Sequence, residues 1–373
     1  MVRRQERKEG VRMMRGHRSL IATLVAVALS SVACGGSVAT SPPFGSSVST
    51  STSIASATAG PSWSSGSTAT SGSTATSEST ATSGSTATSG PTAPPSLSLD
   101  GPIVAWGDGC CGQTNIPAGL SGVTAIAAGD YFSLALKSDG TVVAWGENRN
   151  GQTDVPAGLS GVTAIAAGYL HALALKADGT VVAWGDNEHG KANVPAGLSG
   201  VTAIAAGYDF SLALKTDGTI VGWGNDYSGQ VGLTRRLTDV TAIAAGGTFG
   251  LALKKDGTVV AWGYPTGGQT KVPAGLSGVT AIAAGGSYSL ALKNDGTVVA
   301  WGRDDCGTAD MPASLSGVIA ISGRAKHFLA LKSDGTVVAW GCTGRGTPPP
   351  AGLSGVTAIA AGGEHALALR TAP

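Results

Sequence analysis

A Trp-Gly pair recurs seven times in this chain at a constant interval of 39 residues. The tryptophans are Trp106, Trp145, Trp184, Trp223, Trp262, Trp301 and Trp340. A fixed period near 40 residues indicates a repeat architecture, in which a single unit cannot bury a core of its own. We therefore expect one assembled array that acts through a surface shared by several units.

Each unit reads as a series of short strands. In the unit from Val162 to Gly200, an apolar stretch is followed by Ala172–Lys176 and Thr180–Trp184, which flank an Asp-Gly turn. Asp-Gly between short apolar runs is a strong hairpin signal, because tight hairpin turns need a positive φ that Gly adopts cheaply. A further short strand is expected at Ala192–Val194. The sequence thus predicts an all-β fold, a seven-bladed β-propeller of four-stranded blades.

The array begins and ends part-way through a unit. The chain enters the repeat at Asp100 and its last apolar run ends at Arg370. The run Ile103–Trp106 is therefore expected to pair with the C-terminal run and to close the ring, which removes exposed sheet edges. An open solenoid is the alternative, but such arrays need atypical terminal caps and none is visible.

Residues 1–33 read as an export signal. A basic segment precedes the apolar run Leu20–Leu29, and small residues end at Ala33, where a signal peptidase would cut. A membrane-spanning helix is disfavoured because the apolar core is short. Cys34 follows the cut, and Leu29–Cys34 is similar to a bacterial lipoprotein box. We predict lipidation of Cys34 and an extracytoplasmic, membrane-tethered protein; simple secretion is the alternative.

The rest of the chain divides by composition. Residues 34–98 are mostly Ser, Thr, Ala, Gly and Pro, so we expect a disordered linker. Residues 99–373 hold the repeats and form the propeller. In that part acidic side chains slightly outnumber basic ones and no basic stripe is visible, which argues against a nucleic-acid partner. No metal spacing, cofactor motif or nucleophile signature is found.

The repeat has the pattern GxxxxLALKxDGTVVAWGxNxxGQ, with instances at Gly129–Gln152 and Gly168–Gly190. This pattern resembles the repeat of the regulator-of-chromosome-condensation family of seven-bladed propellers, over about residues 100–371. The compact unit with GQTxVPAGLSGV, at Gly151–Val162, looks most like the secreted bacterial β-lactamase inhibitory protein of propeller type. The resemblance implies the propeller fold and protein partners.

Function is expected to be binding rather than catalysis. We predict a monomeric, extracytoplasmic binding domain that contacts an unidentified protein through loops on one face. A β-lactamase or a cell-wall enzyme is one partner class, and an inhibition assay would test it. A propeller lyase or glycosidase is a second reading, which needs a pair of carboxylates at the axis. A guanine-nucleotide exchange factor, the activity of the eukaryotic namesake, is disfavoured by the export signal.

Aromatic residues in the loops are the candidate binding residues, because interface hot spots favour Tyr, Trp and Arg. They are Tyr131, Phe132, Tyr169, Tyr208, Tyr227 and Tyr264. The repeated Trp residues are expected to pack between blades. His171, His327 and His365 share a unit position with Phe residues and are expected to pack rather than bind a metal.

Four cysteines occupy the turn that follows a Trp-Gly pair, namely Cys110, Cys111, Cys306 and Cys342. Their units become neighbours only if the ring closes, so we predict that they gather on one face. Export favours disulfides. A bridge from Cys342 to Cys306, Cys110 or Cys111 is one outcome; a vicinal Cys110–Cys111 link and unbridged thiols are the others.

Overall fold

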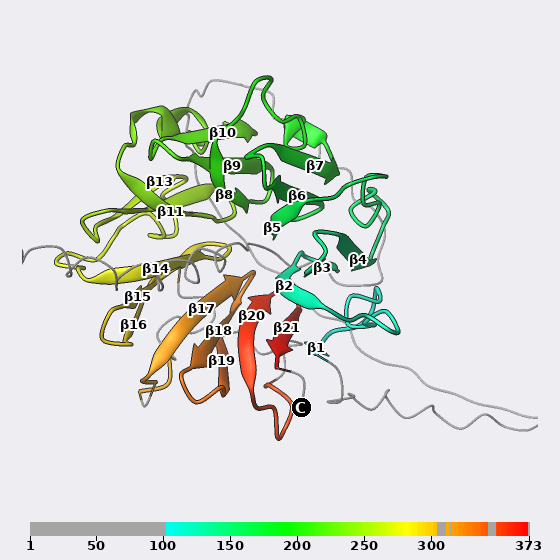
Figure 1. The fold of residues 1–373 in the computed structure, drawn as a ribbon. Coiled ribbons are helices and arrows are strands. Elements are labelled where there is room, and N and C mark those ends of the chain that lie inside the picture. Colours follow the sequence, from blue (N-terminus) through cyan, green and yellow to red (C-terminus); the bar gives the residue numbers. More distant parts are fainter. Residues whose placement is uncertain (1–101, 304–310, 314, 342–347, 372–373) are drawn as a thin grey trace, which may run out of the picture. The chain divides into compact units, whose positions relative to one another are not determined.

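The computed structural model describes residues 102–303, 311–313, 315–341 and 348–371. The predicted lipidation site, Cys34, and the predicted signal and linker lie outside these ranges. In the described part, short antiparallel strands form seven sheets, and Figure 1 shows these sheets grouped around a common centre. No helix among the described residues is long and apolar enough to cross a membrane.

Each sheet has three strands, and the sheets are numbered 1 to 7 in chain order. The first strands are β2 (Val123–Ala128), β5 (Val162–Ala167), β8 (Val201–Ala206), β11 (Val240–Ala245), β14 (Val279–Ala284), β17 (Val318–Arg324) and β20 (Val356–Ala361). The second strands are β3 (Phe132–Lys137), β6 (His171–Lys176), β9 (Phe210–Lys215), β12 (Phe249–Lys254), β15 (Tyr288–Lys293), β18 (His327–Lys332) and β21 (His365–Arg370). The third strands are β4 (Val142–Gly146), β7 (Val181–Gly185), β10 (Ile220–Gly224), β13 (Val259–Gly263), β16 (Val298–Gly302), β19 (Val337–Gly341) and, in sheet 7, β1 (Ile103–Gly107).

The predicted hairpins are confirmed. In sheet 2 the turn between β6 and β7 holds Gly179 at φ +77°, a conformation that favours glycine. Asp178 Oδ1 accepts hydrogen bonds from the backbone N–H and the hydroxyl of Thr180, at 3.0 and 2.6 Å. These bonds fix the turn and align the two strands.

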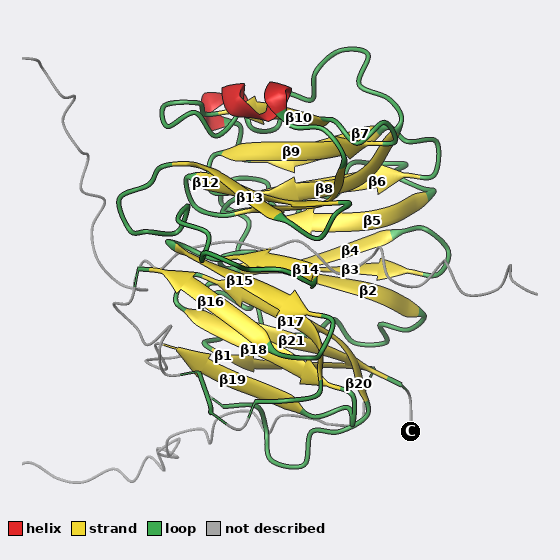
Figure 2. Cartoon of the chain, turned by 90° about the vertical axis from the view of Figure 1, so that its left-hand side faces the viewer, coloured by secondary structure: helices red, strands yellow, loops and turns green. Residues whose placement is uncertain are grey.

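The predicted fourth strand of each blade is wrong, because the described sheets have three strands. At Ala192–Val194 the chain instead makes local turns. Ala192 donates its N–H to the Asn187 side chain at 3.0 Å, and Leu198 donates its N–H to the Pro195 carbonyl at 3.1 Å. Backbone groups that bond within the turn are not available for a strand ladder. Two short 3-10 helices, η1 (Glu188–Gly190) and η2 (Gly232–Arg236), lie in the equivalent segments of two units (Figure 2).

The predicted packing of the tryptophans between neighbouring sheets is confirmed. Trp184, in β7 of sheet 2, lies in one core cluster with Phe132 and Leu134 of sheet 1. Its indole N–H donates to the carbonyl of Gln152 in the preceding unit at 3.1 Å. Trp145, Trp223, Trp262 and Trp301 donate in the same way to the carbonyl 32 residues earlier. Each of these residues therefore joins two units through both its apolar ring and its N–H.

The two ends of the repeat array meet in sheet 7. Strand β1 pairs with β21 in the register Ile103↔Leu369 to Gly107↔His365. This pairing was predicted from the phase of the repeat. Along the chain, the first strand of each sheet contacts the first strand of the next, and β20 also contacts β2.

Side chains and backbone join sheet 7 to sheet 1 as they join other neighbours. His365 Nε2 lies 3.0 Å from Ser133 Oγ, and His171 makes the same contact with Ser211 between sheets 2 and 3. Gly363 donates its N–H to a carbonyl of the first unit at 3.1 Å. The contact between sheets 7 and 1 thus repeats one found inside the array.

Candidate functional site: the loop face

The sheets present two different ends. Phe132 pairs with Gly146, so the β2–β3 connection and the segment after β4 lie at the same end, here called the loop face. The Asp-Gly hairpins lie at the other end, the turn face. The turn face repeats one pattern, with Lys–Asp ion pairs in five units at 2.7 to 3.2 Å. Lys191 and Arg324, two departures from the repeat, lie on the loop face.

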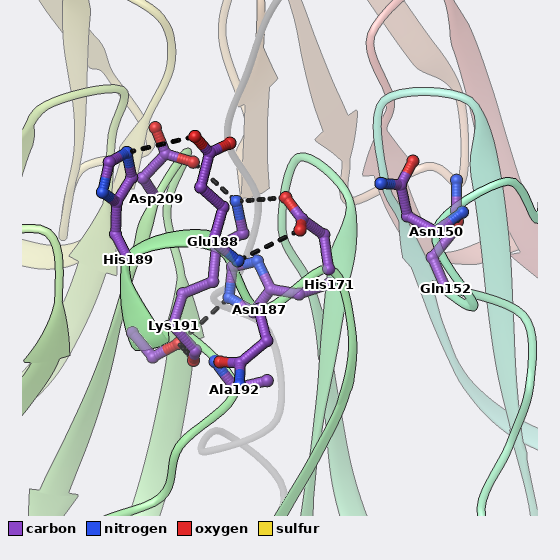
Figure 3. Close-up of polar contacts among 11 residues, drawn as sticks. Asn150, Gln152, His171, Asn187, Glu188, His189, Lys191, Ala192 and Asp209 are labelled. Carbon is purple, nitrogen blue, oxygen red and sulfur yellow. Dashed lines mark hydrogen bonds and ion pairs between the residues drawn. The ribbon is translucent and has the colours of Figure 1, made fainter.

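The first departure on the loop face is Lys191. Gln113, Gln152, Gln230 and Gln269 stand at the equivalent position of other units. Gln152 uses its side-chain oxygen to accept the Asn150 N–H at 2.8 Å, which closes its own turn. Lys191 instead extends its ammonium to two carboxylates, Asp186 Oδ2 and Asp209 Oδ1, each at 2.6 Å (Figure 3).

The Lys191 side chain is buried, with 1% exposed, and its carboxylate partners reach the surface. Burial works against the charged ammonium, but the hydrogen bonds to Asp186 and Asp209 prevail and raise the pKa of Lys191. Burial likewise opposes ionisation of Asp186, yet the Lys191 ammonium lowers its pKa. Lys191 therefore stays charged and holds two carboxylates from adjacent sheets in fixed positions.

A pair of stacked tyrosines adjoins this ion cluster. Tyr169 and Tyr208 come from the β5–β6 and β8–β9 connections, and their ring centroids lie 4.0 Å apart at an interplanar angle of 15°. Burial raises the pKa of Tyr169, and the nearby carboxylates of Asp130, Glu147 and Asp209 raise it further. The tyrosine pair is therefore half-buried and lies in an acidic environment.

Two further polar residues follow Asp186 in η1. Glu188 Oε1 lies 3.8 Å from His189 Nε2 (Figure 3). His189 contacts the ring of Tyr227 edge-on, with centroids 5.8 Å apart, and Tyr227 is 88% exposed. Ring contacts, ion pairs and chain neighbours link eight residues, namely Tyr169, Tyr208, Asp209, Lys191, Asp186, Glu188, His189 and Tyr227. This set is called the Tyr–Asp strip below.

The second departure from the repeat is Arg324, which stands where other units have Gly129, Gly168, Gly207, Gly246, Gly285 and Gly362. Its guanidinium is fully buried and donates to the carbonyls of Ala128, Ala167 and Gly168 at 3.1, 3.1 and 2.8 Å. The Nε atom lies 3.9 Å from the buried carboxylate of Asp130. Arg324 thus ties sheet 6 to sheets 1 and 2.

The glycines that Arg324 replaces are required by close approach rather than by a positive φ. A Cβ on Gly129 would lie 2.0 Å from the ring of Phe132, and one on Gly168 would lie 2.3 Å from His171. In sheet 6, β17 runs one residue further than the other first strands, through Arg324, and Ala325 turns at φ +47°. The local change in backbone frees space for the arginine.

A family model for the regulator of chromosome condensation (RCC1) repeat matches this chain five times, at residues 123–152, 162–191, 201–230, 240–269 and 279–308. Five units of the chain are therefore RCC1 repeats. No curated protein sequence matches it significantly.

Several solved structures of low sequence identity share its fold. Prp20p of Saccharomyces cerevisiae, described with its binding to Gsp1p and histones, matches at TM-score 0.61 and 18% identity, over 72% of this chain and 91% of Prp20p. Human WBSCR16 matches at 0.59 and 19%, over 72% and 98% of the two chains. The ectodomain of the Arabidopsis thaliana receptor kinase ACR4 matches at 0.56 and 20%, over 68% and 95%. At such identities the likeness establishes the β-propeller fold and nothing finer.

The structure separates the predicted binding residues into two groups. Tyr131 and Phe132 are buried, with 6% and 0% exposed, because the residues that open β3 point into the core; they present no surface to a partner. Tyr169, Tyr208 and Tyr227 come together in the Tyr–Asp strip. Tyr264 is 47% exposed on the same face, and no contact described here joins it to the strip.

The sequence shows that Arg324 replaces the recurrent glycine in the sixth unit, but sequence reasoning assigned no functional role to Lys191, Asp209 or Arg324. For Lys191 and Arg324 the available signal is the deviation of one unit from the repeat consensus, whereas the position of Asp209 differs in every unit. The histidines are as predicted where the side chain is described: His171 and His365 are fully buried. Burial, followed by the nearby charge of Lys191, lowers the pKa of His171 to about 3.

Two of the four cysteines in the predicted cluster lie in the described part of the chain. Cys110 and Cys111 have sulfur atoms 3.1 Å apart, longer than the S–S bond of about 2.05 Å. The vicinal link is therefore not formed. Cys110 is disulfide-bonded, and Cys306 and Cys342 lie outside the described residues. Burial, then Glu147, raises the pKa of the Cys111 thiol.

Proposed function

We propose that this RCC1-repeat propeller is an extracytoplasmic protein-binding domain that acts through its loop face. The observation that carries the proposal is the placement of its irregular residues. Lys191, Asp209 and the Tyr169–Tyr208 stack occur on the loop face, whereas the turn face repeats one Lys–Asp motif. The Lys191 ion cluster has no counterpart in the units that carry Gln at this position, so it offers a partner a unique position, and we assign specificity to the loop face.

We propose a binding role instead of catalysis. Two acidic residues that follow Trp-Gly pairs, Asp108 and Asp226, are used by their own turns. Asp108 accepts the Cys110 N–H at 2.9 Å, and Asp226 accepts the Val231 N–H at 2.8 Å. Carboxylates committed to backbone donors fix loop shape, which is what a binding face requires.

The proposal includes a closed ring, supported by the β1–β21 pairing and by the contacts between sheets 7 and 1. It also includes a lipid anchor at Cys34, which rests on the sequence. Replacing Cys34 by alanine should move the protein from the membrane fraction to the medium. Unchanged membrane partitioning would contradict the anchor and leave the binding role untouched. A β-lactamase is the first partner to assay, because the compact repeat is similar to that of the inhibitory protein.

Site-specific photo-crosslinking tests the binding face. Benzoylphenylalanine is introduced at Tyr227 on the loop face or, as a matched control, at Lys255, which is exposed in the hairpin turn between β12 and β13. The full chain is then irradiated with envelope extract of its source cells. We expect a discrete covalent adduct from position 227 and none from position 255. Equal labelling from both positions, or labelling from 255 only, would refute the proposal.

A further inference from the structure

We propose that the Tyr–Asp strip binds a basic segment of the partner protein, with an arginine guanidinium seated against Tyr227 and Glu188. This inference rests on the proposed function and specifies the chemistry of the partner. Three properties of the strip support the inference: its charge, the accessibility of its aromatic rings and the rigidity of its carboxylates.

The strip carries an excess of negative charge. Asp186, Asp209 and Glu188 belong to it, and Asp226 precedes Tyr227 directly. The ammonium of Lys191 neutralises one of these four carboxylates and is itself buried, so it offers no charge to a partner. A cationic segment complements this surface, whereas the phosphates of a nucleic acid or a membrane would be repelled.

The aromatic rings select among cations. Tyr227 is 88% exposed and makes one edge-on contact with His189, which leaves ring surface accessible. The Glu188 side chain is 72% exposed and lies next to that histidine. A planar guanidinium can stack on a tyrosine ring while it donates hydrogen bonds to a carboxylate, and an ammonium cannot do both equally well.

The acidic part of the strip is already ordered before a partner arrives. Lys191 fixes Asp186 and Asp209 at 2.6 Å each, and Tyr208 is held by its stack on Tyr169. Groups that are fixed in advance lose little conformational entropy on binding, which favours affinity. Lys191 therefore acts as a positioning residue that shapes the surface from below.

Peptide binding tests the inference. The probes are fluorescein-labelled (Arg-Gly)4 and (Lys-Gly)4 peptides, titrated with the full chain and followed by fluorescence anisotropy at 20 and 200 mM NaCl. We expect the Arg peptide to bind more tightly than the Lys peptide and to weaken with salt. Tyr227→Ala should weaken Arg-peptide binding about 2- to 5-fold, the size of a cation–π contact at an exposed site. Glu188→Gln should also weaken it.

Asp239→Asn is the matched control, because it removes one exposed charge from the opposite end and Asn tolerates the positive φ of +60° found there. It should leave Arg-peptide binding unchanged. Absence of binding to the wild type at millimolar peptide, or equal losses in Asp239→Asn and Tyr227→Ala, would overturn the inference. If position 227 still crosslinks a partner that the Arg peptide does not displace, the binding face stands and the basic-segment inference fails. If no position on the loop face crosslinks, the proposed function itself fails.

Discussion

Replacing Arg324 by methionine is expected to destabilise the fold strongly while leaving its shape intact. Methionine fills a similar volume but has no charge and no N–H donors. The substitution removes three hydrogen bonds to backbone carbonyls in sheets 1 and 2. It also leaves the carboxylate of Asp130, 3.9 Å from Nε and fully buried, without its nearby cation.

The size of the effect follows from the burial of both groups. Removing one partner of a buried ion pair costs about 3–5 kcal/mol, because the remaining charge stays desolvated. For a large domain, each kcal/mol lowers the melting temperature by about 2 °C. Arg324→Met should therefore lower the melting temperature by about 6–10 °C. At neutral pH the charge is present, although burial lowers the pKa of Arg324 to about 10.

Differential scanning calorimetry at pH 7 measures the effect. Arg149→Met is the control, since the Arg149 side chain is 85% exposed and its loss should change stability by less than about 0.5 kcal/mol. Adding Asp130→Asn to Arg324→Met should restore at least about 2 kcal/mol, because the buried carboxylate that lost its nearby guanidinium is gone. If Arg324→Met melts like Arg149→Met, or if Asp130→Asn adds a further loss, the ion pair of Arg324 and Asp130 does not stabilise the fold.

Three further predictions concern pH, closure and cysteine chemistry. The pKa of His171 is about 3 in the folded state, below the unfolded value of about 6.5, so the unfolded state binds more protons and stability falls as the pH drops between these values. In thermal melts His171→Phe should therefore lose less stability on acidification than the parent. An equal loss in both would contradict a buried, neutral His171. Deleting residues 101–107 removes β1 with its buried Ile103, Val104 and Trp106. Burial of each side chain contributes about 1.5–3 kcal/mol, so the free energy of unfolding measured with denaturant should fall by at least about 5 kcal/mol. An unfolding midpoint equal to that of the parent would refute a stabilising role of the β1–β21 pairing. In a non-reduced Cys34→Ser chain, thiol counting should find two reactive cysteines among four, because Cys110 is bridged; four reactive thiols would eliminate the bridge.

The regular parts of this molecule follow from the repeat. A hairpin recurs wherever Asp-Gly separates two apolar runs, and Trp184 packs between sheets because its position recurs every 39 residues. The pairing of β1 with β21 was predictable from the phase of the array. These features depend on local turn chemistry and on periodic burial, and both can be predicted from the sequence of a single repeat unit.

The prediction of a fourth strand was wrong because turn hydrogen bonds compete with strand pairing in this segment, and the periodicity of the repeat does not reveal them. Asn187 captures the N–H of Ala192, and prolines and side chains close turns in the stretch where a ladder was expected. A short run such as Ala192–Val194 has strand composition but too few backbone donors left for pairing. Side-chain acceptors at turn positions therefore outweighed weak strand propensity.

The candidate site could be predicted only in part. Tyr169, Tyr208 and Tyr227 were identified as aromatic loop residues, but the ion cluster between them was not. Lys191 and Asp209 are 18 residues apart and belong to different sheets, so no local spacing indicates their contact. Arg324 reaches carbonyls 156 to 196 residues away, a contact that depends on how sheet 6 lies against sheets 1 and 2.

The most direct test of the account is the affinity of the crosslinked partner for the strip. Once the partner captured from position 227 is purified, isothermal titration calorimetry compares the wild-type chain with Tyr208→Ala, whose ring stacks on Tyr169 at the inner end of the strip. We expect the dissociation constant to rise at least about tenfold, as for truncation of an aromatic hot spot. An unchanged dissociation constant in a variant that melts like the parent would contradict the claim that this strip is the binding site.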